Sequence, residues 1–197
     1  MRVGLFGGSF NPAHEGHAHV AETALRRLEL DKVIWLVSPQ NPLKSSHETR
    51  PLAERLAGAR QWARGAGMIV SDAETRLGSQ YTIDTLRVLR ARFPGVKFVW
   101  IMGADSLASF HRWRGWTQIM REAQGGAVQF NYGVRTIRSA AGLDEAEGKL
   151  IVERLKKSLP ASAAAILADA TAPAWVYLTG PLNYASSTAL RKRQTKG

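Results

Sequence analysis

A glycine-rich turn near the N-terminus narrows the possible folds of this chain more than any other segment. Residues 3–6 are apolar enough to form a short buried strand, and Gly7-Gly8 ends it by letting the backbone turn where a side chain would clash. Apolar side chains then recur at helical spacing, which places His14 and His17 at the mouth of a helix. Backbone N–H groups and the positive end of the helix dipole make such a mouth an anion site. The segment therefore predicts a phosphate-binding turn, with a nucleotide phosphate as its natural occupant.

The same residues also have simpler explanations. Glycine pairs often end strands in plain turns, and two histidines near a helix start could be an accident or a fragment of a metal site. His19 shows that imidazoles are frequent here, and we assign it no role. The combination of strand, glycine pair, proline and paired histidines favours a ligand. No G-x-G-x-x-G fingerprint opens this turn and no G-x-x-x-x-G-K-[ST] string occurs in the chain, so hydride-transfer enzymes and P-loop ATPases are disfavoured.

Apolar runs alternate with helical patterns along the chain, which predicts an α/β fold with a doubly wound, mostly parallel sheet. Strands are predicted at residues 2–6, 33–37, 68–71, 97–102 and 175–178, with a short strand possible at 127–130. Helices are predicted at residues 16–29, 51–63, 82–92, 115–122, 144–158 and 187–194, and 161–174 as a connection or weak helix. Ligands bind beyond the carboxyl ends of the strands in such sheets, so the loops that follow strands matter most.

Size and composition indicate one domain. A chain of 197 residues, 45% of them hydrophobic, can bury one substantial core, so we expect a single domain over residues 1–197. The absence of cysteine excludes disulfide and thiolate chemistry, and no apolar run approaches the length that spans a bilayer. The chain starts with a strand pattern rather than a signal sequence. We therefore expect a cytoplasmic protein without a membrane partner.

The net charge of +11 makes nucleic acid a partner to consider, because a basic surface attracts phosphates without reading sequence. Lys and Arg are spread through the chain, however, and are dense only at residues 156–157 and 191–193. No recognition-helix, zinc-finger or aromatic single-strand signature accompanies them. Nucleic acid is therefore disfavoured, and a homo-oligomer is left open.

Two loops carry further polar candidates. Two prolines stiffen the loop 38–44 and place Lys44 at the carboxyl edge of the sheet, where its ammonium could neutralise a substrate phosphate. A solvated loop lysine would explain Lys44 if it stood alone. Thr82 is expected to cap the helix that it begins, with Thr85 one turn later, and capping alone would explain that pair.

The strand at 97–102 runs into Gly103 and Asp105. Gly103 lets the backbone approach a ligand closely, and Asp105 is placed to accept hydrogen bonds from a ribose. Trp113, between two arginines, could stack on a flat electron-poor ring whose carboxylate those arginines favour. Core packing is the alternative for Trp113 and Trp116, with one of them in the core and the other partly exposed.

A second helix mouth lies near the C-terminus, in the string Ser186-Ser187-Thr188. Serine and threonine commonly cap helices, which is the simpler explanation. The same mouth also offers hydroxyls and backbone N–H groups to phosphates, with Arg191 one turn along the helix.

Taken together, these motifs resemble the nucleotidyltransferase superfamily. Its G-x-F-x-P-x-H-x-G-H signature is matched by Gly8, Phe10, Pro12, His14, Gly16 and His17. The string 186–191 looks like its S-S-T-x-x-R signature, and the strings 41–44 and 81–85 resemble one branch, the nicotinate-nucleotide adenylyltransferases. The resemblance covers about residues 1–122 and 173–194. Residues 123–142 depart from it, because they hold Gly125-Gly126 and lack the usual Arg-Pro-Gly.

The resemblance implies a Rossmann-like nucleotidyltransferase fold and transfer of the adenylyl group of ATP to nicotinate mononucleotide, giving deamido-NAD and pyrophosphate in NAD biosynthesis. The implied catalytic residues are His14, His17 and Arg191, the implied ATP-binding residues are Gly8, Ser9, Phe10, Gly103, Asp105, Ser187 and Thr188, and the implied acceptor-binding residues are Lys44, Thr82, Thr85 and Trp113. Mg²⁺ is expected with ATP, bridging its phosphates and held mainly by the substrate.

Two other functions are kept open. A related adenylyltransferase could act on nicotinamide mononucleotide or phosphopantetheine, although an aromatic platform such as Trp113 is pointless for a pantetheine arm. A basic nucleotide- or RNA-binding module could also keep the fold without catalysis.

Overall fold

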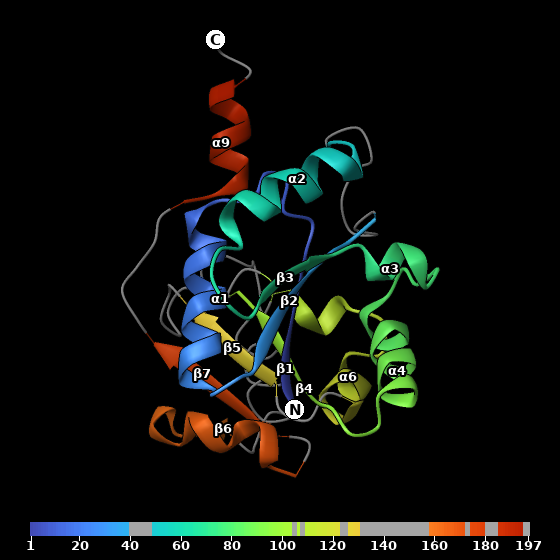
Figure 1. Cartoon of the computed structure of the whole chain (residues 1–197), viewed down its shortest axis with the longest axis vertical. Coiled ribbons are helices and arrows are strands. Elements are labelled where there is room, and N and C mark those ends of the chain that lie inside the picture. The colour runs from blue at the N-terminus through green and yellow to red at the C-terminus, as the bar shows by residue number, and fades with distance from the viewer. Residues whose placement is uncertain are drawn as a thin grey trace.

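The computed structural model describes residues 1–39, 49–103, 106, 109–122, 126–130, 158–171, 174–179 and 185–194. Within these residues the chain forms a central parallel sheet with helices on both faces (Figure 1).

In the described part of the chain the sheet contains seven strands in the order β3-β2-β1-β4-β5-β7-β6, and every neighbouring pair is parallel. The strands are β1 (Arg2–Gly8), β2 (Lys32–Val37), β3 (Met68–Ser71), β4 (Lys97–Met102), β5 (Gly126–Phe130), β6 (Ser158–Leu159) and β7 (Trp175–Thr179). Each predicted strand, including the short one at 127–130, is confirmed to within two residues. The α/β doubly wound prediction is therefore confirmed, and β6 is the addition that it missed.

The helices are α1 (Glu15–Arg27), α2 (Leu52–Trp62), α3 (Ala73–Arg76), α4 (Thr82–Arg92), α6 (Trp116–Glu122) and α9 (Ser187–Gln194), with 3₁₀ helices η2 (Phe110–Arg112) and η3 (Ala161–Asp169). The helix predicted at 82–92 has the bounds of α4, but Thr82 is its first helical residue and Tyr81 is the N-cap, so the capping role expected for Thr82 is wrong. The helix predicted at 51–63 begins one residue later, because Pro51 is the N-cap of α2. The predicted helix at 144–158 lies outside the described residues except Ser158, which begins β6. The stretch 161–174 was predicted as a connection or a weak helix. Its first nine residues form the 3₁₀ helix η3.

Two apolar cores cover the two faces of the sheet. One joins α1, α2 and η3 to residues such as Trp35 and Val176, and the other joins α4, η2 and α6 to residues such as Trp100 and Leu86. Position 7 on β1 requires a glycine, because a Cβ there would collide with the ring of Trp100. No helix in the described part of the chain is long and apolar enough to cross a membrane.

The strand order reverses between β1 and β4, which are hydrogen-bonded neighbours. From β1 the chain moves outward through β2 and β3, then returns to the other side of β1 as β4. The loops that leave the carboxyl ends of β1 and β4 therefore diverge at this point, and they open the crevice in which ligands of such sheets bind.

Candidate active site

The turn after β1 is shaped by the ring of Phe10. Its backbone lies in the left-handed region, with φ at +44°, and its side chain is 1% exposed. The ring lies 5.1 Å from the Trp35 ring and 5.0 Å from the His17 ring, centroid to centroid. A non-glycine residue in this backbone region costs on the order of 1–3 kcal/mol, which burial of the aromatic ring offsets. Gly8 leaves room for the ring, because a Cβ there would lie 3.0 Å from it.

The two histidines of the turn lie together at the start of α1. His14 is the N-cap residue, and its N–H donates to Nδ1 of His17 over 3.2 Å. The two imidazole centroids are 3.8 Å apart. Because Nδ1 of His17 accepts a hydrogen bond, the neutral ring carries its proton on Nε2. The structure thus supplies a fixed N–H donor at the helix mouth, where the sequence predicts an anion.

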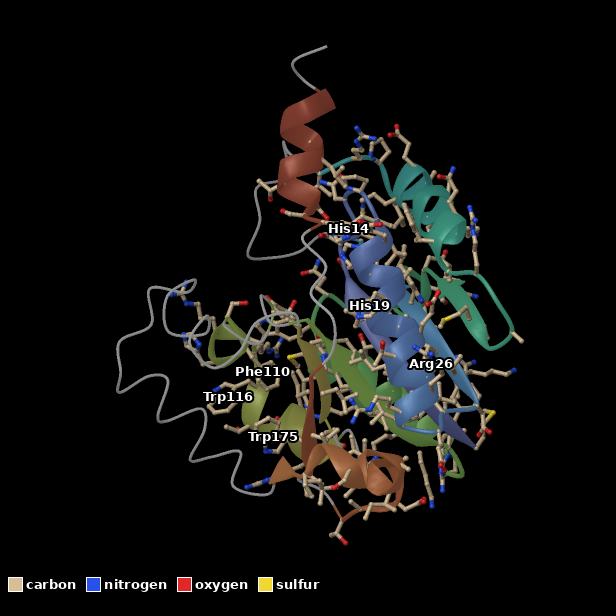
Figure 2. The ribbon with its side chains drawn as sticks, turned by 90° about the vertical axis from the view of Figure 1, so that its left-hand side faces the viewer. His14, His19, Arg26, Phe110, Trp116 and Trp175 are labelled. Carbon is tan, nitrogen blue, oxygen red and sulfur yellow. The ribbon has the colours of Figure 1, made fainter. Side chains whose placement is uncertain are left out.

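The C-terminal helix α9 docks onto the same turn. The hydroxyl of Ser187 donates to the carbonyl of Pro12 over 2.8 Å, and Nη1 of Arg191 donates to the carbonyl of Asn11 over 2.6 Å. Figure 2 shows the start of α9 beside His14, with Arg26 at the far end of α1. The N-terminal turn and the C-terminal helix α9 therefore meet beside His14, as the paired motifs predict.

Two donors of the α9 motif, the Ser187 hydroxyl and the Arg191 guanidinium, are engaged with the protein itself. Ser187 uses its hydroxyl proton to hold Pro12, so its side chain fixes the position of the helix. Thr188 accepts a hydrogen bond from Nη2 of Arg191 over 3.4 Å, which leaves its own hydroxyl proton directed elsewhere.

Arg55 on α2 also binds the turn, from the side away from α9. The sequence motifs did not single out this residue. Its side chain is 2% exposed, and burial lowers the pKa of its guanidinium. It donates to main-chain carbonyl oxygens of Ser9 (2.9 Å), Ser38 (2.7 Å), Pro39 (2.8 Å) and Arg50 (2.9 Å). A signal was present in the sequence, because Arg55 occupies the apolar face that Leu52, Leu56 and Ala59 define.

The start of α4 presents Thr82 but encloses Thr85. Thr82 is half-buried at the first helical position, whereas the Thr85 side chain is 0% exposed. Its Oγ1 lies 2.6 Å from Oγ of Ser79 and donates to Glu74 over 3.3 Å. A ligand at this helix start would meet Thr82 and the first backbone N–H groups. The expected direct contact by the Thr85 hydroxyl does not fit this burial, and Thr85 instead braces the helix from inside.

The buried carboxyl of Glu74 makes this brace sensitive to pH. Burial raises the pKa of Glu74 from its ordinary value of 4.5 to about 7, and the Thr85 hydrogen bond opposes that rise only in part. The folded protein therefore binds this proton more tightly than the unfolded chain does. The free energy of unfolding should fall as pH rises from about 4.5 to about 7, then level off.

Replacing Glu74 with glutamine should remove this dependence, because the amide stays neutral and still accepts from Thr85. Between about pH 5 and pH 8 the wild-type protein should lose roughly 2–3 kcal/mol of unfolding free energy relative to Glu74→Gln. Urea unfolding at a series of pH values measures both slopes. Parallel slopes for the two proteins would show that Glu74 does not titrate in this range.

Trp113 follows η2 and lies partly open to solvent. Its ring packs edge-on against Phe110, at 5.4 Å, and against Trp100, at 6.2 Å between centroids. Trp116 is also half-buried, so both tryptophans are partly exposed, and the expectation that one of them lies in the core is wrong. Arg114 does not lie free beside Trp113, because its guanidinium covers the Tyr81 ring at 4.8 Å and lies 3.6 Å from Asp84.

Gly103 lies where expected, directly after β4 at the carboxyl edge of the sheet. Asp105 and Lys44 lie outside the described residues, as does the string 41–44. Their assignments stay predictions.

Known proteins resemble this chain along its whole length. The sequence pattern of the cytidylyltransferase-like family matches residues 5–193. A probable nicotinate-nucleotide adenylyltransferase of Caulobacter sp. (strain K31) is 77% identical over 197 residues, covering 100% of both chains. One of Methylorubrum extorquens, also a probable nicotinate-nucleotide adenylyltransferase, is 46% identical over 193 residues, covering 98% of this chain and 100% of the relative.

Solved structures share the fold. The nicotinic acid mononucleotide adenylyltransferase of Plasmodium falciparum, complexed with NaAD, superposes with a TM-score of 0.67 at 16% identity. The match covers 97% of this chain and 82% of that one.

Proposed function

The chain belongs to the cytidylyltransferase-like family and, within it, to the nicotinate-nucleotide adenylyltransferases, and we propose that it uses the turn between β1 and α1 to transfer the adenylyl group of ATP to nicotinate mononucleotide. The products are deamido-NAD and pyrophosphate, in NAD biosynthesis. The observation that carries the assignment of the site is the docking of α9 on that turn, through Arg191 to Asn11 and Ser187 to Pro12.

The reaction asks the protein for alignment and charge stabilisation. The phosphate of the mononucleotide is already a nucleophile and attacks the α-phosphorus of ATP in line, while pyrophosphate leaves with the bonding electron pair. No covalent bond to the protein is needed. Groups that donate hydrogen bonds to the phosphates as charge shifts toward pyrophosphate lower the barrier.

We assign His17 to the α-phosphate, with its Nε2–H as donor. The geometry supports this role, because the His14 N–H occupies Nδ1 and fixes the ring orientation. His14 stands beside it as a second donor. Backbone groups of Gly8, Ser9 and Phe10 cradle the nucleotide, and Gly103 allows it to approach β4.

The leaving pyrophosphate is assigned to α9. Thr188 and Arg191 are proposed to bind its oxygens, and Ser187 keeps the helix against the turn. A guanidinium suits this task, because its planar fork matches two phosphate oxygens at once.

The acceptor is assigned to the other face of the sheet. Trp113 is proposed to stack on the pyridine ring, with Thr82 and the N–H groups at the start of α4 facing its carboxylate. Thr85 acts through the helix that it braces. The resemblance also assigns the acceptor phosphate to Lys44 and the adenosine to Asp105.

Mg²⁺ is proposed to enter with ATP. Within the described residues, no group of three or more His, Cys, Asp or Glu side chains is placed to hold a metal ion. Mg²⁺ prefers phosphate oxygens and water, so the triphosphate itself supplies its ligands. When bound, the ion neutralises the charge that develops on the departing phosphates.

Pyrophosphate release from the purified protein tests the function. Incubated with ATP and Mg²⁺, the protein should release pyrophosphate with nicotinate mononucleotide at least about 10-fold faster than with nicotinamide mononucleotide or phosphopantetheine. A faster reaction with either of these would move the assignment to the related transferases. No release with any acceptor would favour the binding module, for which ATP affinity without turnover is the expected result.

A further inference from the structure

Arg55 is buried in an unusual setting for a guanidinium. A buried charge is costly unless hydrogen bonds satisfy it, and the acceptors of Arg55 in the described residues are main-chain carbonyls. Those carbonyls belong to the loop after β1, the loop after β2 and the residue before Pro51. One side chain thus ties the loop after β1 to both ends of the connection between β2 and α2.

The bond to Ser9 controls the direction of an amide in the nucleotide turn. In a trans peptide the carbonyl and the following N–H point in opposite directions. Because Nη1 of Arg55 holds the Ser9 carbonyl toward α2, the Phe10 N–H points away from α2. The same peptide leads into the left-handed backbone of Phe10, so its orientation has few alternatives once the ring is buried.

The bond to Ser38 couples the two loops. Nη1 donates to the carbonyls of Ser9 and Ser38 together, and the Ser38 N–H donates to the carbonyl of Gly8 over 3.0 Å. Oδ1 of Asn11 ties the turn to the start of α2 as well, because it accepts from the Arg50 N–H over 3.3 Å. On its other side the turn is held by α9, because Arg191 donates to the Asn11 carbonyl over 2.6 Å. The turn is therefore fixed between α2 and α9.

We propose that Arg55 is a positioning residue for adenylyl transfer, which sets the amide direction of the nucleotide turn and its spacing from the loop after β2 without touching either substrate. This inference rests on the proposed function of the same turn. Arg55 thereby keeps the turn in the conformation that the triphosphate needs, so that binding ATP requires no rearrangement.

The test compares Arg55→Met, Arg55→Lys and the control Arg60→Met, which removes an exposed arginine from the same helix. Arg55→Met should raise KM for ATP about 10-fold and lower kcat about 10-fold at temperatures well below its Tm. Arg55→Lys should recover part of both, because an ammonium keeps the charge and three donors. Arg60→Met should stay within about twofold of wild type in both.

Binding of α,β-methylene-ATP, measured by calorimetry, gives a readout that needs no turnover. Its dissociation constant should rise about 10-fold in Arg55→Met. A structural role alone would lower Tm and leave KM, kcat and this constant unchanged in the folded protein, which would overturn the inference. If Arg55→Met does not fold, Arg55→Lys decides by the same three values. Wild-type protein without pyrophosphate release would refute the proposed function instead, while the calorimetric comparison would still decide the role of Arg55.

Discussion

Replacing His17 with alanine should lower kcat by on the order of 10³-fold, with a much smaller change in KM for ATP. The variant removes the Nε2–H donor that the His14 N–H orients, so the loss falls on the transition state, where charge on the phosphates is greatest. Steady-state pyrophosphate release measures the effect. A binding module without catalysis would release no pyrophosphate, and its affinity for nucleotides would be nearly the same with and without His17.

His19→Ala is the matched control for this variant. His19 lies on the same helix and has no assigned role, so its removal should change kcat by less than about twofold. His17→Ala also removes the acceptor for the His14 N–H, which should lower stability by about 1 kcal/mol. Unfolding in urea separates that loss from the catalytic one. Equal activity of the two alanine variants would remove His17 from the mechanism.

Replacing Arg191 with methionine should lower kcat by on the order of 10²-fold and raise KM for ATP. The guanidinium has two tasks in this account, since it fixes the Asn11 carbonyl and is assigned to the leaving pyrophosphate. Arg191→Lys should recover only a small part, because one ammonium cannot bind the carbonyl and two phosphate oxygens in the same fork geometry. Initial rates over a range of ATP concentrations separate kcat from KM.

Arg26→Met serves as the control for Arg191. Arg26 lies exposed at the far end of α1 from the histidines (Figure 2), so its loss changes the net charge equally without touching the site. Similar losses in the two variants would show that overall charge, and not the position of Arg191, governs the rate.

Local patterns predict most of the fold. The apolar runs at β1, β2 and β4 are buried on both faces, and their residues leave little choice but a parallel sheet with helices on each side. The missed elements are short. β6 has two residues and exists through its pairing with β7, and α3 has four, too few for a hydrophobic period to show.

The site is predicted where a motif is local and missed where contacts come from tertiary packing. The histidine turn and the α9 motif each carry their chemistry in consecutive residues, so their pairing could be inferred from sequence. The burial of Thr85 depends on Glu74 and Ser79, which pack around it from outside α4. Arg55 has no motif, because its acceptors are main-chain carbonyls that any sequence would supply.

The crystal structure of the protein with α,β-methylene-ATP and Mg²⁺ tests most directly whether both ends of the chain bind one triphosphate. We expect Nε2 of His17 within hydrogen-bonding distance of the α-phosphate and the guanidinium of Arg191 on the terminal phosphates of the same molecule. A triphosphate that contacts one of these residues and lies away from the other would contradict it.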